Sequence, residues 1–337
     1  MKKYNTTVFI LRGQPFHNAH LEIIWRASCV SDQVVVIIGS AYQPRTYKNP
    51  WNETERYHMI REALNSKKIT NVSIEFNTDS IYNDHAWIMR VQSIVATYES
   101  NNSKVAIIGH DKDVSSWYMN AFPQWHRESV DLIEPLHSTD IRELYFRQDV
   151  NMNFIQGVVP SSTFNFLEKF RETEDYQQVL REREFIATYK KQYAGLAYPP
   201  VFVTTDAVVV QSGHVLMIQR KAEPGKNLMA LPGGFLDQNE LIVDGAIREL
   251  KEETKIKVPV PVLKGSIKKS HVFDHPNRSA RGRTITHAFF IELPDGILPK
   301  VTGSDDAAYA KWVPISELDS RCCFEDHAEI ISFFTGT

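Results

Sequence analysis

The most informative stretch of the sequence is "GGFLDQNELIVDGAIRELKEETKI", residues 233–256. Two glycines lead into an expected helix on which Glu249, Glu252 and Glu253 stand at positions i, i+3 and i+4. This spacing places three carboxylates on one helix face, where they repel one another unless a cation lies between them. Mg²⁺, or alternatively Mn²⁺, suits such hard oxygen ligands. The stretch therefore predicts a site for a divalent cation, and the alternative is an ordinary solvated helix face.

The same stretch, which follows "MAL" in "MALPGG", resembles the Nudix box, with its glycines, a glutamate and the run "RELKEE" at that family's spacing. The resemblance implies a loop-helix-loop that holds a divalent metal against a diphosphate, in an α/β/α fold with a mixed sheet. It also implies that Glu249 and Glu253 are the principal catalytic ligands and that Glu252 is an auxiliary ligand. Arg248 is expected to orient these carboxylates. Lys255 stands where the family has a glycine that favours the turn after the helix, so we expect it to affect the geometry of that turn.

Two later segments bear on the substrate of this half. "FDHPNRSARGRTITHAFF" and "SDDAAYAKWVPISEL" resemble segments of ADP-ribose pyrophosphatases, which implies hydrolysis of ADP-ribose to AMP and ribose 5-phosphate. The residues expected to bind ADP-ribose are then Arg281, Arg283, Asp305 and Asp306, with the two acids placed to assist the attacking water. Solvated arginines and ordinary loop acids are the alternatives. For the half as a whole, the alternative is a sensor that binds ADP-ribose or NAD without hydrolysing it.

The first half of the chain alternates short apolar runs with amphipathic stretches. The runs are "TVFIL", "VVVIIG", "VSIEF", "VAIIG" and "VDLIE", the last at residues 130–134. Strands that are buried on both faces and separated by helices predict an α/β domain with a parallel sheet and helices on both of its faces. Such sheets bind ligands at the carboxyl ends of their strands. The segment "RGQPFHNAHL", with His17 and His20, follows the first run and is expected at that edge.

Residues 11–20 resemble the G-x-F-x-P-x-H-x-G-H motif of nucleotidylyltransferases, most closely in the form found in archaeal-type NMN adenylyltransferases. Pro15, His17 and His20 match the motif. The positions that depart from it are Leu11, Gly13 and Ala19. Three further segments, "RTYKNPWNETER", "IYNDHAWIMRV" and "HSTDIR", resemble motifs of the same family in the same order. The resemblance implies a Rossmann-like domain that transfers the adenylyl group of ATP to NMN, giving NAD and pyrophosphate, with nicotinate mononucleotide as the alternative acceptor.

This resemblance also assigns the site residues of the first half. His17, His20 and Arg142 are expected to be catalytic, because adenylyl transfer needs groups that position and neutralise phosphates rather than a protein nucleophile. The expected ATP and NMN ligands are Arg12, Gly13, Lys48, Arg56, Asp84, Trp87, Ser138 and Thr139. The alternatives are surface cations for the arginines and the lysine, a core side chain for Trp87, and a structural pair at a strand-helix turn for the histidines.

Composition sets the domain organisation and the classes of partner. The chain of 337 residues is 42% hydrophobic, enough for two cores, and residues 161–197 are rich in charged and amide side chains. We therefore expect an adenylyltransferase domain at 1–160, a helical connector at 161–197 and a Nudix domain at 198–337. A net charge of −3 with dispersed Lys and Arg argues against nucleic acid as a partner, and the sequence contains no run long enough to span a membrane. Three cysteines without C-x-x-C spacing fit a reducing cytoplasm, and homo-oligomer formation stays open.

Overall fold

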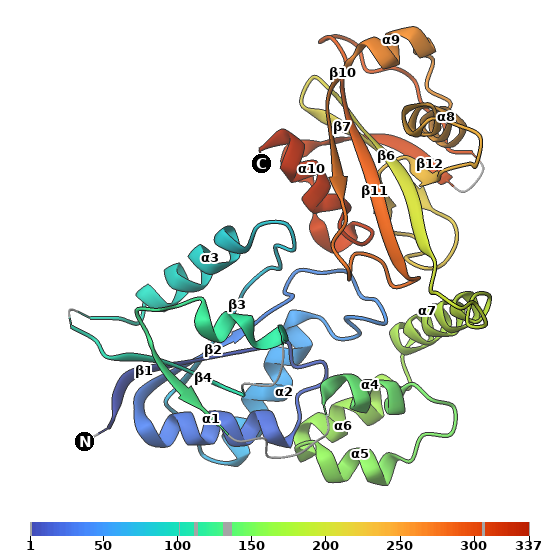
Figure 1. Ribbon diagram of the computed structural model, residues 1–337. Coiled ribbons are helices and arrows are strands. Elements are labelled where there is room, and N and C mark those ends of the chain that lie inside the picture. Colours follow the sequence, from blue (N-terminus) through green and yellow to red (C-terminus); the bar gives the residue numbers. More distant parts are fainter. Residues whose placement is uncertain (1, 101, 111–113, 131–136, 305–306, 337) are drawn as a thin grey trace. The chain divides into compact units, whose positions relative to one another are not determined.

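The computed structural model describes the chain except for residues 1, 101, 111–113, 131–136, 305–306 and 337, and except for the side chains of 114–116. The chain forms two compact units (Figure 1). One comprises Met1–Arg45 and Asn49–Gln178, and the other comprises Thr46–Lys48 and Val179–Thr337. Among the described residues, no helix combines the length and the apolar character needed to span a bilayer.

The first unit is built on a five-stranded parallel sheet with the strand order β3-β2-β1-β4-β5. The strands are β1 (Tyr4–Leu11), β2 (Ser31–Ile38), β3 (Val72–Phe76), β4 (Val105–Gly109) and β5 (His126–Ser129). The fold class predicted for this half is confirmed. The fifth strand had been expected at residues 130–134, but the paired strand ends at Ser129, and 131–134 lie outside the described residues.

Helices connect these strands and cover the sheet on both faces. They are α1 (Asn18–Val30), α2 (Glu53–Ser66), α3 (Asp84–Ala96), α4 (Ser138–Tyr145), α5 (Met152–Val158) and α6 (Ser161–Phe170), with the 3-10 helix η1 (Val114–Asn120). Val8 and Val35 pack with Val91 and Val95 of α3 on one face. Because side chains alternate along a strand, Phe9 and the other buried residues between them point to the opposite face, where α1 contacts β1 and β2.

The second unit contains a mixed sheet between helices. Its strands are β6 (Val201–Gln211), β7 (His214–Arg220), β8 (Met229–Ala230), β9 (Gly233–Phe235), β10 (Ile267–Phe273), β11 (Arg283–Glu292) and β12 (Ala307–Pro314). The main strand order is β10-β11-β6-β7-β12, and β11 runs parallel to β6 whereas the other described pairs are antiparallel. The mixed sheet expected for this half is therefore confirmed.

Two helices pack against this sheet through apolar side chains. The helical elements are α7 (Glu174–Lys191), α8 (Ile242–Thr254), α9 (Val260–Gly265), α10 (His327–Thr335) and the 3-10 turns η2 (Ile315–Glu317) and η3 (Ser320–Cys322). Ala246 and Leu250 of α8 pack on Ala207 and Val209 of β6. Phe334 of α10 stacks on Phe290 of β11, whose centroid is 5.6 Å away. Of the expected connector, α6 lies in the first unit, and the division between the units falls within α7.

Candidate active sites

The loop between β1 and α1 carries the two histidines. Gly13 has a φ of +62°, a left-handed conformation that glycine adopts without steric cost. His17 is the N-cap of α1 and is buried, and its backbone N–H donates to Nδ1 of His20 at 3.4 Å. The two rings stack with centroids 3.7 Å apart. Because a backbone N–H can only donate, Nδ1 of His20 is unprotonated and its ring proton sits on Nε2.

The start of α4 lies against the same loop. Ser138 Oγ donates to the carbonyl of Pro15 at 3.2 Å, and Arg142 Nη1 donates to the carbonyl of Gln14 at 3.0 Å. Arg142 is buried, and its Nη2 lies 3.5 Å from Thr139 Oγ1. Two segments more than a hundred residues apart are thereby joined, and the N-termini of α1 and α4 both bring partial positive charge to this loop. This arrangement suits a group rich in phosphate.

Arg56 joins the backbone that follows the neighbouring strands β1 and β2. Its side chain is only 1% exposed, so it is not a surface cation. Nη1 donates to the carbonyls of Arg12 and Gly39 at 2.6 and 2.7 Å, and Nη2 donates to the carbonyl of Ser40 at 2.9 Å. Burial lowers the pKa of Arg56 to about 10. These contacts indicate that Arg56 supports the loop backbone.

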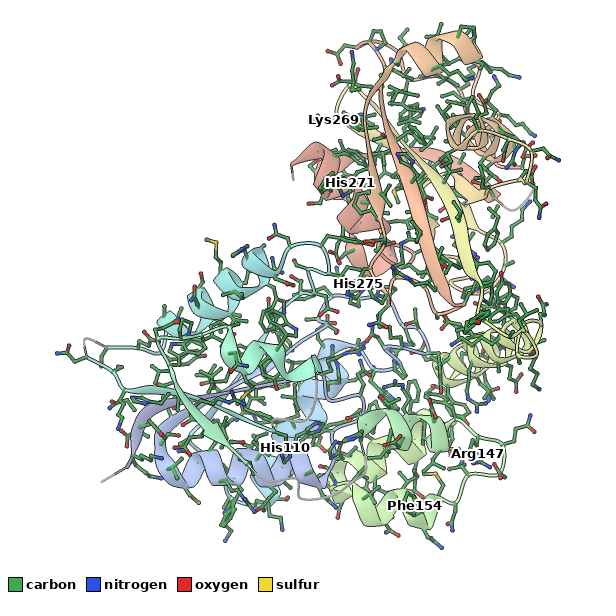
Figure 2. All side chains as sticks on the ribbon, in the orientation of Figure 1. His110, Arg147, Phe154, Lys269, His271 and His275 are labelled. Atoms are coloured by element: carbon green, nitrogen blue, oxygen red, sulfur yellow. The ribbon has the colours of Figure 1, made fainter. Side chains whose placement is uncertain are left out.

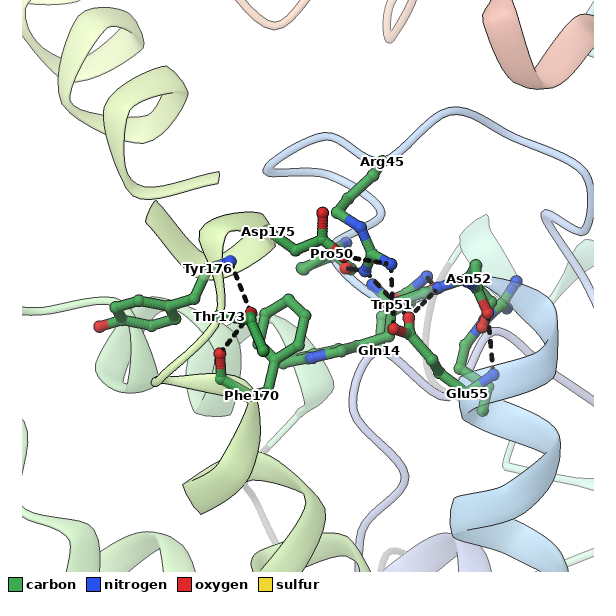
Figure 3. Close-up of polar contacts among 11 residues, drawn as sticks. Gln14, Arg45, Pro50, Trp51, Asn52, Glu55, Phe170, Thr173, Asp175 and Tyr176 are labelled. Carbon is green, nitrogen blue, oxygen red and sulfur yellow. Dashed lines mark hydrogen bonds and ion pairs between the residues drawn. The ribbon is translucent and has the colours of Figure 1, made fainter. Parts of the chain in front are cut away.

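A second set of contacts fixes the segment that precedes α2 (Figure 3). Gln14 Nε2 donates to the carbonyl of Trp51 at 2.8 Å, and the N–H of Trp51 donates to Gln14 Oε1 at 3.2 Å. The two carboxylate oxygens of Glu55 accept hydrogen bonds from Nη1 and Nη2 of Arg45, each at 2.9 Å. Arg12, which is exposed, donates from Nη2 to Asn49 Oδ1 at 2.5 Å.

Three other expected ligands come from other segments of the chain. Lys48 belongs to the second compact unit, where its Nζ donates to the carbonyl of Asn277 at 3.2 Å. Asp84 is exposed in the first turn of α3. Trp87 is half-buried on the same helix, and its ring lies 5.4 Å from that of Trp117. Trp87 therefore packs partly in the core while keeping an accessible surface.

Three polar residues near this loop were not identified from the sequence. His110 (Figure 2) directly follows β4, which neighbours β1 in the sheet, and its Nδ1 lies 2.7 Å from the carbonyl of Val130. Gln14 and Asn49 make the contacts described above. Gln14 lies inside a quoted motif, and His110 directly follows a buried apolar run, so position alone could have identified both of them.

In the second unit, Arg248 of α8 binds the carboxylates of Glu240, Glu249 and Glu252. Its Nε and Nη2 donate to the two oxygens of Glu240 at 3.0 and 2.8 Å. Its Nη1 donates to Glu249 Oε1 at 2.8 Å and to Glu252 Oε2 at 3.0 Å. Hydrogen bonding to Arg248 lowers the pKa of Glu240, and the hydrogen bond to Glu240 is the largest cause of the raised pKa of Arg248.

The remaining candidate ligand, Glu253, is held by the backbone at the start of β9. It is buried, and its Oε2 accepts the N–H of Gly233 at 3.0 Å. Burial raises the pKa of Glu253 to about 8 and also raises the pKa of Glu249. A Cβ at Gly234 would lie 2.5 Å from Glu249 Oε1, so the glycine leaves the space in which this carboxylate sits.

The donor set fits a divalent cation, because hard carboxylate oxygens line a space that a side chain at Gly234 would fill. Within the described residues, no group of three or more His, Cys, Asp or Glu side chains is already arranged to hold a metal ion. Glu249 and Glu252 instead bind Arg248, and Glu253 binds the backbone. A cation would therefore compete with Arg248 for two of the carboxylates.

Lys255 makes the turn after α8 for which the Nudix family uses a glycine. It is the C-cap of α8 with a φ of +48°, and its N–H donates to the carbonyl of Lys251 at 3.0 Å. The left-handed conformation costs a residue with a side chain about 1–2 kcal/mol. The departure at Lys255 thus carries an energetic cost while leaving the turn in place.

The remaining candidates of this half lie on and beside β11. The guanidinium carbon of Arg281 lies 5.2 Å from the ring centroid of Phe235, which directly follows the glycine pair. Arg283 Nη1 donates to the carbonyl of Asp274. Asp305 and Asp306 lie outside the described residues.

Both halves match known families. Residues 13–158 match the cytidylyltransferase-like family model, and residues 201–333 match the NUDIX domain model. The crystal structure of a bifunctional NMN adenylyltransferase/ADP ribose pyrophosphatase from Francisella tularensis is 36% identical, with 99% of both chains covered and a TM-score of 0.94. The chain belongs to the family of bifunctional NMN adenylyltransferase/ADP-ribose pyrophosphatases.

Relatives of the separate halves agree with this family. A nicotinamide/nicotinic acid mononucleotide adenylyltransferase of Acinetobacter baylyi is 35% identical over 180 residues, which are 53% of this chain and 93% of that protein. An ADP-ribose pyrophosphatase of Methanocaldococcus jannaschii is 30% identical over 155 residues, which are 46% of this chain and 81% of that protein. A second bifunctional structure from Francisella tularensis, complexed with AMP and Mn ion, is 35% identical with a TM-score of 0.93, again with 99% of both chains covered.

Proposed function

We propose that this bifunctional family member makes NAD and pyrophosphate from ATP and NMN, and that it hydrolyses ADP-ribose to AMP and ribose 5-phosphate. The observation that carries the proposal is the likeness to the Francisella tularensis enzyme over 99% of both chains. The two polar sites described above support it, because one presents donors for phosphates and the other presents carboxylates for a divalent cation. The proposed domain division is that of the sequence: 1–160, a connector at 161–197, and 198–337.

In the first reaction the protein positions and neutralises phosphates. The phosphate of NMN attacks the α-phosphorus of ATP, pyrophosphate leaves, and no protein nucleophile is required. His20 can donate from Nε2, since its Nδ1 accepts the N–H of His17. The N-termini of α1 and α4 add positive potential, and Arg142 contributes a buried charge beside Gln14. Trp87 and Asp84 are proposed for the nicotinamide end, and Arg12, Gly13, Lys48, Ser138 and Thr139 for the phosphates and sugars.

In the second reaction α8 supplies the metal ligands. Glu249 and Glu253 would hold the ion, with Glu252 as an auxiliary ligand. When bound, a divalent cation polarises the diphosphate and lowers the pKa of attacking water. Gly233 fixes one oxygen of Glu253, and Arg248 fixes Glu249 until the ion and the diphosphate compete for these groups. Arg281 and Arg283 are proposed to bind ADP-ribose, together with Asp305 and Asp306.

We propose Mg²⁺ as the ion, because it prefers oxygen ligands and accompanies ATP phosphates, with Mn²⁺ as a substitute. The reactions are placed in the cytoplasm, where the three cysteines would stay reduced. The partners are small molecules, namely ATP, NMN and ADP-ribose.

The test is incubation of the pure protein with ATP, Mg²⁺ and either NMN or nicotinate mononucleotide, and separately with ADP-ribose, NAD and NADH. Chromatography should show NAD in the first series, and AMP with ribose 5-phosphate from ADP-ribose in the second. A preference for nicotinate mononucleotide would change the proposed acceptor. Both nucleotides are tested because the Acinetobacter baylyi relative is named for both. ADP-ribose that is bound tightly but left intact would make the second half a sensor.

A further inference from the structure

A segment near the C-terminus holds the stretch that leads to Gly233 and Gly234. The N–H of Phe324 donates to the carbonyl of Met229 at 2.8 Å, and Cys323 forms a parallel bridge with Met229. His327, the first residue of α10, is 6% exposed, and its Nδ1 accepts the N–H of Leu231 at 2.8 Å. The contact joins residues 96 positions apart.

This contact determines the protonation state of the imidazole. Since a backbone N–H can only donate, Nδ1 of His327 must be unprotonated, and the neutral ring carries its proton on Nε2. Burial lowers the pKa of His327 and outweighs the attraction of Asp206, Asp326 and Glu325 for a positive charge. Arg278 opposes a positive charge there and binds both oxygens of Asp326 at 2.9 Å.

The loop leads from Leu231 directly to the metal-binding carboxylate. The carbonyl of Pro232 accepts the N–H of Ala207 at 2.8 Å, and the N–H of Gly233 donates to Glu253 Oε2 at 3.0 Å. Three consecutive loop residues are therefore fixed by α10, β6 and α8 in turn. A shift at Leu231 must be absorbed within two residues or passed on to Glu253.

We propose that His327 is a positioning residue for ADP-ribose hydrolysis: its neutral imidazole holds Leu231 and thereby sets the Gly233–Glu253 contact, and protonation of Nδ1 in acid releases the loop. The proposal rests on the hydrolase function proposed above. His327 itself does not touch the reacting atoms.

Three substitutions separate this role from general support of the core. His327→Asn keeps an acceptor close to the position of Nδ1 and does not titrate, His327→Gln places its amide one atom farther out, and His327→Leu has no acceptor. At pH 8 we expect the Asn variant to keep a kcat near that of the parent. The Gln and Leu variants should lose about 10- to 100-fold in kcat, the scale of a small misplacement of catalytic groups, with a smaller change in KM. NAD synthesis, measured in the same samples, should be unchanged in all three.

The pH profile gives a second readout. The ratio of parental kcat to that of the Asn variant should be constant at alkaline pH. As the pH is lowered beyond the ordinary histidine pKa of about 6.5, this ratio should decrease. A ratio that stays constant down to pH 5 overturns the proposal. So does an Asn variant that loses as much kcat as the Leu variant, or a Gln variant with parental kcat. If the Leu variant does not fold, the Asn and Gln pair decides.

Amide hydrogen exchange makes the test independent of hydrolysis. Peptides covering residues 229–233 should exchange faster in the Gln variant than in the parent or the Asn variant at the same pH. If the parent does not hydrolyse ADP-ribose, the proposed function fails, and this exchange pattern alone then shows whether His327 holds the loop. Equal exchange in the Asn and Gln variants overturns the proposal, as does faster exchange combined with parental kcat.

Discussion

His20 carries its ring proton on Nε2, because its Nδ1 accepts the N–H of His17, and we propose that this Nε2–H donates to the phosphates of ATP. Replacing it with alanine removes one preorganised donor, so we expect His20→Ala to lower kcat for NAD synthesis about 10²–10³-fold. ADP-ribose hydrolysis in the same sample should be unaffected. His58→Ala is the matched control, because His58 is an exposed histidine on α2. Parental NAD synthesis by the His20 variant would remove this residue from the site.

Glu253→Gln should abolish ADP-ribose hydrolysis while NAD synthesis continues. The amide keeps the shape of the side chain and can still accept the N–H of Gly233, but it lacks the charge that holds a divalent cation. Glu249→Gln should approach this severity, and Glu252→Gln should be milder, since Glu252 is the more exposed carboxylate of α8. The measurement is kcat at limiting and at saturating Mg²⁺.

Lys255→Gly is the control for the Glu253 series. It relieves the left-handed φ of +48° and should leave hydrolysis at the parental rate. Parental hydrolysis by Glu253→Gln at both Mg²⁺ levels would exclude Glu253 as a metal ligand.

Candidate site residues could be identified from the sequence where their arrangement depends on neighbouring positions in the chain. The i, i+3 and i+4 spacing of the α8 carboxylates follows from helix geometry, so their common face was predictable. The contacts of Gly233 with Glu253 and of Leu231 with His327 join residues 20 and 96 positions apart, and no local pattern encodes them. Arg56 stays a proposed ligand, and the bonds from its guanidinium to the carbonyls of Arg12 and Ser40 are likewise encoded by no local pattern.

At the scale of elements, α7 contains a buried carboxyl group whose ionised form is disfavoured by its surroundings. Glu182 is buried, its Oε2 accepts the N–H of Tyr47 at 2.5 Å, and burial raises its pKa to about 7. The pKa of Glu182 is higher in the folded state than in the unfolded state, so binding a proton favours folding. This contribution to stability is complete below the unfolded pKa of about 4.3. This stability is lost as the pH rises through about 7.

Glu182→Gln should therefore raise the free energy of unfolding at pH 8 by about 1–3 kcal/mol, with little change near pH 4.5. The comparison is urea unfolding of parent and variant at the two pH values. Glu184→Gln, two residues along α7 and exposed, should show no such pH dependence. An equal effect of Glu182→Gln at both pH values would mean that the carboxylate is not destabilised by its burial.

Elements were predictable where hydrophobic pattern and capping agreed. Asn52 and Glu55 form the reciprocal cap that starts α2, and asparagine is among the residues favoured at an N-cap. The four apolar runs became β1 to β4, of which β1, β2 and β4 are largely buried and β3 is buried in part. β5 was placed too late in the chain, because its residues His126–Ser129 are polar and largely exposed and carry no apolar signal.

At the scale of the whole molecule, the separate sites predict that the two activities can be divided. All the catalytic residues proposed for NAD synthesis lie in the first unit, and Glu249 and Glu253 lie in the second. Fragments 1–178 and 179–337, expressed separately, should therefore each keep one activity. Precipitation of either fragment, or loss of its activity, would show that one half requires the other.

The second fragment should nevertheless be less stable than the same unit in the full chain. The second unit includes Thr46–Lys48, so a fragment that begins at Val179 loses the Tyr47 N–H that Glu182 accepts. The carboxylate of Glu182 keeps the backbone hydrogen bond from Gly225, but with one donor fewer and with Glu223 and Glu325 nearby its charged form is disfavoured above pH 7. We expect the fragment to unfold at lower urea concentration than the unit in the full chain at pH 8, and Glu182→Gln to restore part of the difference. A fragment as stable as the intact unit would show that Thr46–Lys48 adds nothing to the second fold, although it packs there.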